Sequence, residues 1–155
     1  MRRKRLLAER RRAASVAPAF AGVDVGYDPA VAPNPAEWLA LDEGERISLA
    51  EAYHRRAGVV LPDMHLHATV HVVIENQIAM GDEVPTRGAV ERLMGQGLDR
   101  HQAIHAAGSV LTDTLWGFHR EGATAEAAGE TFNTEMEALT VERWHEKHGE
   151  KEEEC

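Results

Sequence analysis

Between Asp63 and Ile78 the sequence DMHLHATVHVVIENQI places polar and apolar residues at helical spacing. His67, His71 and Glu75 follow one another at intervals of four, so on a helix of about 100° per residue they form one stripe. The adjoining arc carries the aliphatic residues Leu66, Val70, Val73, Ile74 and Ile78. This pattern predicts a helix whose polar stripe runs along one border of its buried face.

A second segment, DRHQAIHAAGSVLTDTLW, repeats the spacing with His101 and His105. Aliphatic residues lie next to this pair on the same helical face, where the small residues Ala107 and Gly108 would let another helix approach closely. We expect Asp99 to cap this helix, which should continue to about residue 119. The two segments therefore predict two helices that pack with their histidines near a shared interface.

The remaining sequence predicts an all-α protein, an irregular bundle of about five or six helices. We expect the other helices at about residues 36–41, 42–58, 86–94 and 124–149, the last as one continuous helix. Sustained alternation with hairpin turns, which would indicate strands, is not found in the sequence. Trp38, Tyr53 and Trp116 are interpreted as anchors of the core.

Charge is distributed unevenly along the chain. Seven of the 17 Lys and Arg residues lie in MRRKRLLAERRR, whereas from residue 13 onward ten bases accompany 25 acids. We interpret residues 1–33 as a basic arm and Ala/Pro/Gly linker, disordered or extended, and residues 149–155 as an acidic tail. The acidic body should repel nucleic acid. A weak nucleic-acid contact through the arm, or an unidentified protein partner, stays open.

The cysteine content and hydropathy indicate a cytoplasmic protein. Cys155 is the sole cysteine, which excludes a disulfide within one chain and fits a reducing compartment. No stretch approaches the roughly 20 apolar residues that a membrane span requires. Any metal site in this chain must therefore be built without a thiolate inside the helical region.

The histidine stripes have the chemistry of a metal site. Imidazole and carboxylate groups bind Zn²⁺ or iron at about 2.1 Å. Two side chains four residues apart can share an ion, but residues eight apart are separated by about 12 Å of helix. Hence one ion could take two of the first stripe together with the second pair, or two ions about 3.5–4 Å apart could divide the set. We predict a site for a divalent metal ion, zinc or iron, formed by His67, His71, Glu75, His101 and His105, with Glu75 as a base or bridging ligand.

The same residues carry a resemblance to a known family. The pattern H-x-x-x-H-x-x-x-E-x-Q, followed by R-H-x-x-x-H and a Leu-Trp pair, resembles the bacterial family named domain of unknown function 1841. The chain supplies it, over about residues 34–119, with His67, His71, Glu75, Gln77, Arg100, His101, His105, Leu115 and Trp116. The resemblance implies that the histidines and Glu75 act as one set, and it brings no established activity.

A looser similarity is to hemerythrin-like di-iron bundles. In that comparison His71 and Glu75 stand for one ligand helix, His101 and His105 for the next, and His54 for a histidine of an earlier helix. The long gap between Glu75 and His101 departs from the pattern. Iron and O₂ chemistry is what this similarity would imply.

These observations lead to one functional hypothesis and one competing class. Residues 34–148 are interpreted as a helical metal-binding domain of open biological role, with metal-dependent hydrolysis or O₂ and iron chemistry as candidate activities. Whether the protein is an enzyme is left open. The competing class is a non-catalytic helical adaptor or sensor, whose histidines are structural or respond to pH because packed imidazoles repel when protonated.

Overall fold

The computed structural model describes residues 26–149, and all regular structure in this part of the chain is helical. The helices are α2 (Pro35–Ala40), α3 (Glu43–Arg56), α4 (Met64–Ala79), the 3₁₀ turn η1 (Gly81–Glu83), α5 (Thr86–Gly95), α6 (Arg100–Glu121), α7 (Ala125–Ala138) and α8 (Val141–His148). The predicted all-α class is confirmed. The basic arm and the acidic tail lie largely in residues 1–25 and 150–155, outside the described residues.

Local sequence fixes where several helices begin and end. The side chain of Asn34 accepts hydrogen bonds from two backbone N–H groups at the start of α2, with Pro35 in the first helical position. Asp99 and Gln102 form a capping box at the start of α6. That helix ends at Gly122, whose φ of 64° lies in the left-handed region that favours glycine. The predicted Asp99 cap of α6 is confirmed, and α2 begins one residue before its expected start.

The expected single helix at residues 124–149 is wrong, because the chain is divided there into α7 and α8. Leu139 has extended backbone and a buried side chain, and the Thr140 hydroxyl then accepts a hydrogen bond from the N–H of Arg143 to start α8. The guanidinium of Arg92 donates to the carbonyls of Met136 and Leu139. Side chains thus replace the backbone hydrogen bonds that a continuous helix would have made.

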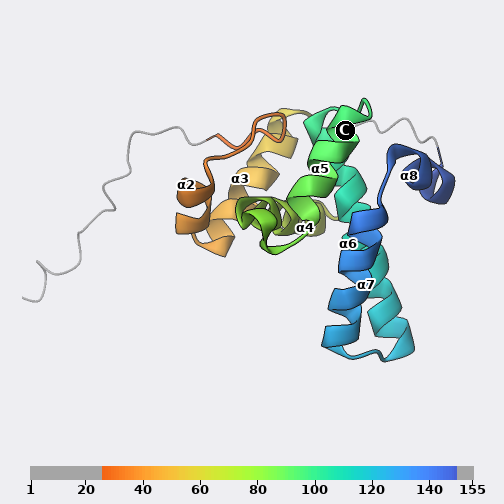
Figure 1. Ribbon diagram of the computed structural model, residues 1–155. Helices are drawn as coiled ribbons and strands as arrows, with labels where there is room; N and C mark the ends of the chain where they lie inside the picture. The colour runs from red at the N-terminus through yellow and green to blue at the C-terminus, as the bar shows by residue number, and fades with distance from the viewer. Residues whose placement is uncertain (1–25, 150–155) are drawn as a thin grey trace, which may run out of the picture.

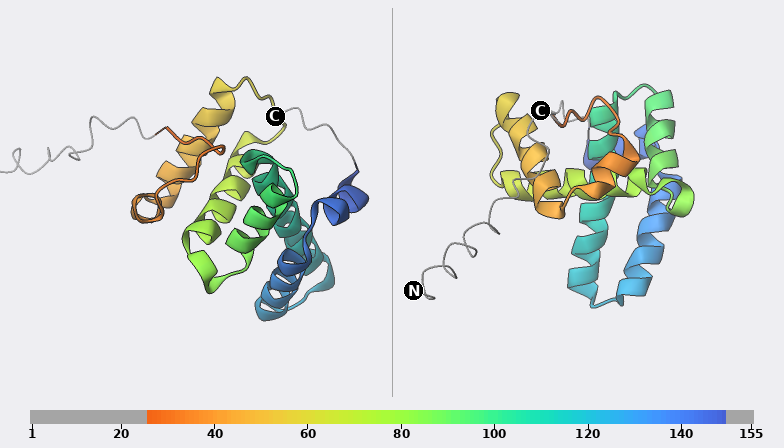
Figure 2. Two further views of the ribbon diagram at one scale, coloured as in Figure 1. Left: turned by 45° about the horizontal axis from the view of Figure 1, so that its top comes forward. Right: turned by 90° about the vertical axis from the view of Figure 1, so that its left-hand side faces the viewer.

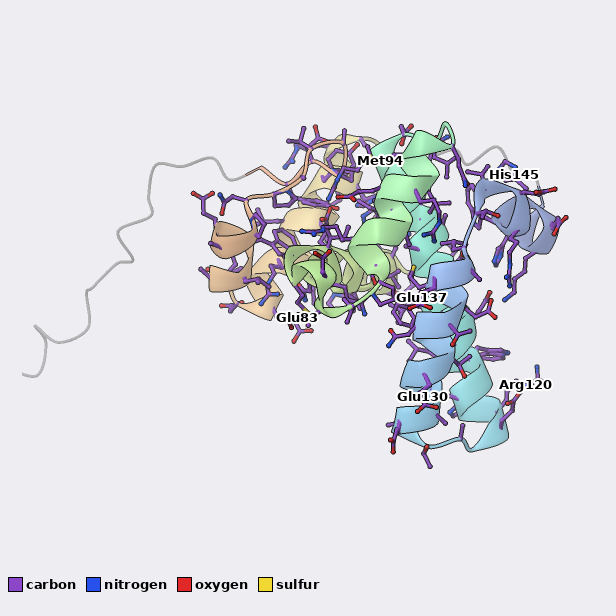
Figure 3. All side chains as sticks on the ribbon, in the orientation of Figure 1. Glu83, Met94, Arg120, Glu130, Glu137 and His145 are labelled. Atoms are coloured by element: carbon purple, nitrogen blue, oxygen red, sulfur yellow. The ribbon has the colours of Figure 1, made fainter. Side chains whose placement is uncertain are left out.

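The helices form two layers that meet at α4. Helix α4 contacts both α3 and α6, and it runs across the direction of α6 (Figure 2, right). Helices α6 and α7 lie side by side, and their outer halves project away from the other helices (Figure 1). Figure 3 shows Arg120 projecting from the outer part of this hairpin. The first turns of α6, which carry His101 and His105, pack instead against α4.

The core has two parts. One joins α4 to α5, α6, α7 and α8, and the other joins the Tyr27 and Trp38 rings to α3 and α4. The expectation that Trp116 anchors the core is wrong, since its side chain is 64% exposed on the projecting half of α6, whereas Trp38 is 4% exposed. Among the described residues, none of the helices has the length and apolar composition needed to cross a membrane.

The crossing of α4 and α6 depends on a glycine. A β-carbon added to Gly108 would lie 2.8 Å from Cγ1 of Val70, closer than such atoms approach in folded proteins. The predicted close approach at this position is therefore confirmed. It brings the histidine stripes of the two helices together.

Candidate metal centre

Five imidazoles from three helices gather where α3, α4 and α6 meet. His54 comes from α3, His67 and His71 from α4, and His101 and His105 from α6. Four of these rings offer nitrogen atoms that all lie within 4.8 Å of one another, namely His54, His71, His101 and His105. They are close enough together to hold a metal ion.

His67 adjoins this group of four. Its Nε2 is 3.0 Å from Nε2 of His54, and its ring centroid is 4.8 Å from that of His71 and 5.1 Å from that of His105. We use the name imidazole cluster for the five residues together. The sequence prediction placed four of them at one site and assigned His54 only through the hemerythrin comparison.

Within the imidazole cluster, His71 and His105 make a direct contact across the α4–α6 crossing. Their Nε2 atoms are 2.9 Å apart. The residue spacing of each stripe placed both rings on the interface, and the close approach at Gly108 brings the helices near enough for the rings to touch. These two side chains point toward a common position.

Hydrogen bonds outside the cluster fix the state of His54. Its Nδ1 lies 2.7 Å from the carbonyl oxygen of Ala50. A carbonyl can only accept, so Nδ1 carries the proton, and in the neutral ring Nε2 then carries the lone pair. The nitrogen that faces the cluster is consequently the one able to bind a metal.

His71 is held in a similar way by a longer chain of groups. The hydroxyl of Tyr27 donates to Oε1 of Glu75 at 3.0 Å and lies 3.2 Å from Nδ1 of His71. Because the single hydroxyl proton goes to the carboxylate, the oxygen can accept the Nδ1 proton of His71. This arrangement again leaves a lone pair on Nε2, the atom that faces His105.

Arg100 binds Glu75, the last group in this series of hydrogen-bonded side chains. Its Nη1 and Nη2 donate to the two carboxylate oxygens of Glu75 at 2.8 and 2.7 Å, and Nη1 also donates to the carbonyl of Pro29. The Glu75 and Arg100 side chains are 1% and 8% exposed. This paired, bidentate arrangement offsets the cost of burying both charges.

The structure therefore places Glu75 beside the imidazole cluster with both oxygens already hydrogen-bonded. Direct ligation by Glu75 stays a prediction. Sequence reasoning missed Tyr27, which lies in a segment without periodicity, and it treated Arg100 only as part of a motif. The sequence did contain one usable indication of the Glu75–Arg100 pair. An acid lies on the stripe of α4 and a base lies at the first position of α6, and these two helices were expected to pack together.

Burial sets the charge state of these groups. Burial, followed by the neighbouring imidazoles with His105 first, lowers the pKa of His71 far below its usual range. Burial also lowers the pKa of His54, and burial beside the Glu75 carboxylate raises the pKa of Tyr27. Two protonated rings about 5 Å apart would repel by about 3 kcal/mol at an effective dielectric constant of 20. His54 and His71 are thus neutral near pH 7, the form in which imidazole binds metals.

A cleft of about 470 Å³ reaches the cluster between α4 and α6, and its lining includes His67, His71 and His105. A separate cavity of about 360 Å³ is lined by Glu75 and Arg100 and by none of the five histidines. Solvent and small molecules can therefore approach the imidazoles from the side of the first cleft.

Fold and site together define a small helical domain with a histidine-rich centre that could hold a metal ion. Residues 29–138 match the family described as Domain of unknown function (DUF1841), so the chain belongs to that family. The match extends beyond the expected residues 34–119 and takes in Pro29, which accepts from Arg100, and the whole of α7. No curated protein and no solved structure matches the chain.

Proposed function

We propose that the protein binds a divalent metal ion, zinc or iron, in the imidazole cluster. The ligands are nitrogen atoms of His54, His71, His101 and His105. The observation that carries this proposal is the pairing of imidazole nitrogens at 2.9 Å across the α4–α6 crossing, with the His71 ring oriented so that its lone pair faces its neighbour.

The spacing of the four imidazole nitrogens suits a bound cation better than it suits histidines that only pack against one another. Two nitrogens bound at about 2.1 Å to one tetrahedral ion lie about 3.4 Å apart. The four candidate ligand atoms lie within 4.8 Å of one another, so small side-chain rotations bring them to that spacing. Without a cation, His105 must supply a proton to the lone pair of His71, and a metal ion replaces that proton.

His67 and Glu75 have separate roles in this proposal. His67 lies at the edge of the group of four and next to the cleft, where it serves as an exchangeable ligand or as a hydrogen-bonding group for a bound molecule. Glu75 orients the Tyr27 hydroxyl, which in turn orients His71. Partners of this kind are known to set the orientation and basicity of histidine ligands.

The donor set limits the chemistry. Ligation by neutral imidazoles suits zinc and iron, as it also suits nickel and copper, and it leaves the ion its full charge. When bound, such an ion would supply Lewis acidity for hydrolysis or, as iron, a site for O₂ chemistry. The chain's own contribution is a buried, pre-oriented set of nitrogens that is reached through one described cleft.

The test is the metal content of protein purified without a histidine tag and measured by mass spectrometry. We expect stoichiometric metal in the wild type and in His119→Ala, whose histidine is exposed on the projecting half of α6. His71→Ala and His105→Ala should each lose it. Visible absorption characteristic of oxo-bridged iron would identify a di-iron centre. Metal-free wild type that rejects added zinc and iron would overturn the proposal and favour the adaptor or sensor class.

A further inference from the structure

The cleft beside the imidazole cluster has the size and lining of a small-molecule site. Its volume of about 470 Å³ falls in the range of sites that take small ligands. Its walls are the aliphatic side chains of Leu61, Pro62, Leu66, Val70 and Ile104, contributed by α4, α6 and the loop before α4. Its polar part consists of three imidazoles together with Asp63, Ser109 and Thr112.

Charge restricts what this cleft can accept. None of the described residues that line it is a lysine or an arginine, and Asp63 contributes a carboxylate. The hydroxyls of Ser109 and Thr112 donate their protons to backbone carbonyls of α6. A polyanion such as phosphate would therefore find no cationic side chain and few free donors along these walls.

The inner end of the cleft becomes positively charged once the imidazole cluster holds a metal ion. Neutral histidines leave the ion with two positive charges, and the charge of Glu75 is already neutralised by Arg100 at 2.7 Å. A positive centre at the end of an apolar cleft favours a negatively charged group, since an uncompensated ion in a weakly polar site is costly.

We propose that the cleft binds a small monocarboxylate with an apolar tail, its carboxylate joining the four histidines as a fifth ligand of the metal and its tail along the aliphatic walls. This proposal rests on the metal site proposed above. It assigns Leu66 to tail binding, because this side chain lines the cleft and is 57% exposed. A bound tail would cover apolar surface that otherwise faces water.

The size of the effect follows from apolar burial. Each methylene group buried contributes enough to raise affinity about fourfold. Affinity should therefore rise steeply through the series acetate, butyrate and hexanoate until the cleft is filled. Covering about half of the exposed surface of Leu66 corresponds to about a fivefold change in hexanoate affinity.

The experiment uses full-length protein loaded with zinc, whose occupancy is measured first, and titration calorimetry with acetate, butyrate, hexanoate, hexylamine and phosphate. We expect binding that strengthens with carboxylate chain length, requires zinc, and is weaker for hexylamine and phosphate. Leu66→Ser should lower hexanoate affinity about fivefold and leave zinc occupancy unchanged. The matched control is Leu115→Ser, which alters a leucine of similar exposure (54%) that does not line the cleft.

The two proposals fail in different ways. Full zinc occupancy with no chain-length dependence, tighter binding of phosphate or hexylamine, or equal effects of Leu66→Ser and Leu115→Ser would overturn the ligand proposal alone. Failure to bind zinc would overturn the metal site and the ligand proposal together. Cobalt-loaded protein gives an independent readout, because hexanoate should change its visible spectrum when the carboxylate reaches the metal.

Discussion

Replacing Glu75 by glutamine removes a buried negative charge while keeping the shape of the side chain. In the native protein both carboxylate oxygens accept from Arg100 at 2.7 and 2.8 Å, and one also accepts from the hydroxyl of Tyr27. Glutamine offers a single carbonyl oxygen to these donors. The guanidinium of Arg100, 8% exposed, is left without a counter-charge.

The expected loss in free energy of unfolding is large for a single substitution. Removing one partner of a buried ion pair costs about 3–5 kcal/mol, since the other charge stays buried and uncompensated. By comparison, Glu51→Gln removes a charge paired with Arg55 and His65, whose side chains are 66% and 72% exposed. Surface pairs of that kind contribute about 0–1 kcal/mol. The two substitutions make the same chemical change, but the partners of Glu51 are exposed to water whereas Arg100 is buried.

Urea denaturation of metal-free protein, followed by circular dichroism, gives both free energies of unfolding. A double-mutant cycle with Arg100→Met isolates the pair, and the double variant should be clearly less destabilised than the sum of the two single variants. In addition, Glu75→Gln should weaken metal binding about 10- to 100-fold, because the chain from Glu75 through Tyr27 to His71 is disturbed. A loss below about 1 kcal/mol in Glu75→Gln, with additive effects in the cycle, would show that Glu75 and Arg100 do not act as a buried ion pair.

Three further predictions concern the same region. Tyr27→Phe should weaken metal affinity about 10- to 100-fold by releasing Nδ1 of His71, as measured by competition with a chelator; unchanged affinity would remove Tyr27 from the site. Gly108→Ala should destabilise the protein by about 1–3 kcal/mol because its β-carbon clashes with α4. Gly117→Ala, which meets no atom within 4 Å, should instead stabilise it by up to about 1 kcal/mol, as thermal melting can show. Finally, the folded-state pKa values of His54 and His71 lie below the ordinary value of 6.5. The unfolded chain thus binds more protons, and metal-free protein should lose stability as the pH falls below about 6.5, as urea midpoints at about pH 7.5 and about pH 5.5 would reveal.

Helical periodicity carried most of what could be predicted about the fold. The apolar arc and polar stripe of α4, and the Asp99 cap and small residues of α6, depend on residues close together in the chain. Spacings of three and four therefore predicted both helices and the face on which they meet. The division of α7 from α8 was missed because it depends on Arg92, more than 40 residues earlier, which satisfies the carbonyls that the break exposes.

The site could be predicted only in part for the same reason. His71, His101 and His105 belong to i, i+4 pairs, which local sequence reveals. His54 stands alone on α3, and its approach to the others follows from how α3 packs on α4. Tyr27 comes from a segment that lacks helical periodicity, and its hydroxyl reaches residues 44 and 48 positions later in the chain. The spacing of residues along the sequence therefore indicates neither the His54 contact nor the Tyr27 contacts.

In the proposed site, one cation occupies the space between the facing nitrogens of α4 and α6. Anomalous diffraction from crystals grown with zinc, in protein free of any histidine tag, tests it most directly. We predict an anomalous peak about 2.1 Å from Nε2 of both His71 and His105. Anomalous peaks confined to exposed histidines, with the two Nε2 atoms still 2.9 Å apart and no ion near them, would show that the imidazole cluster is not a metal site.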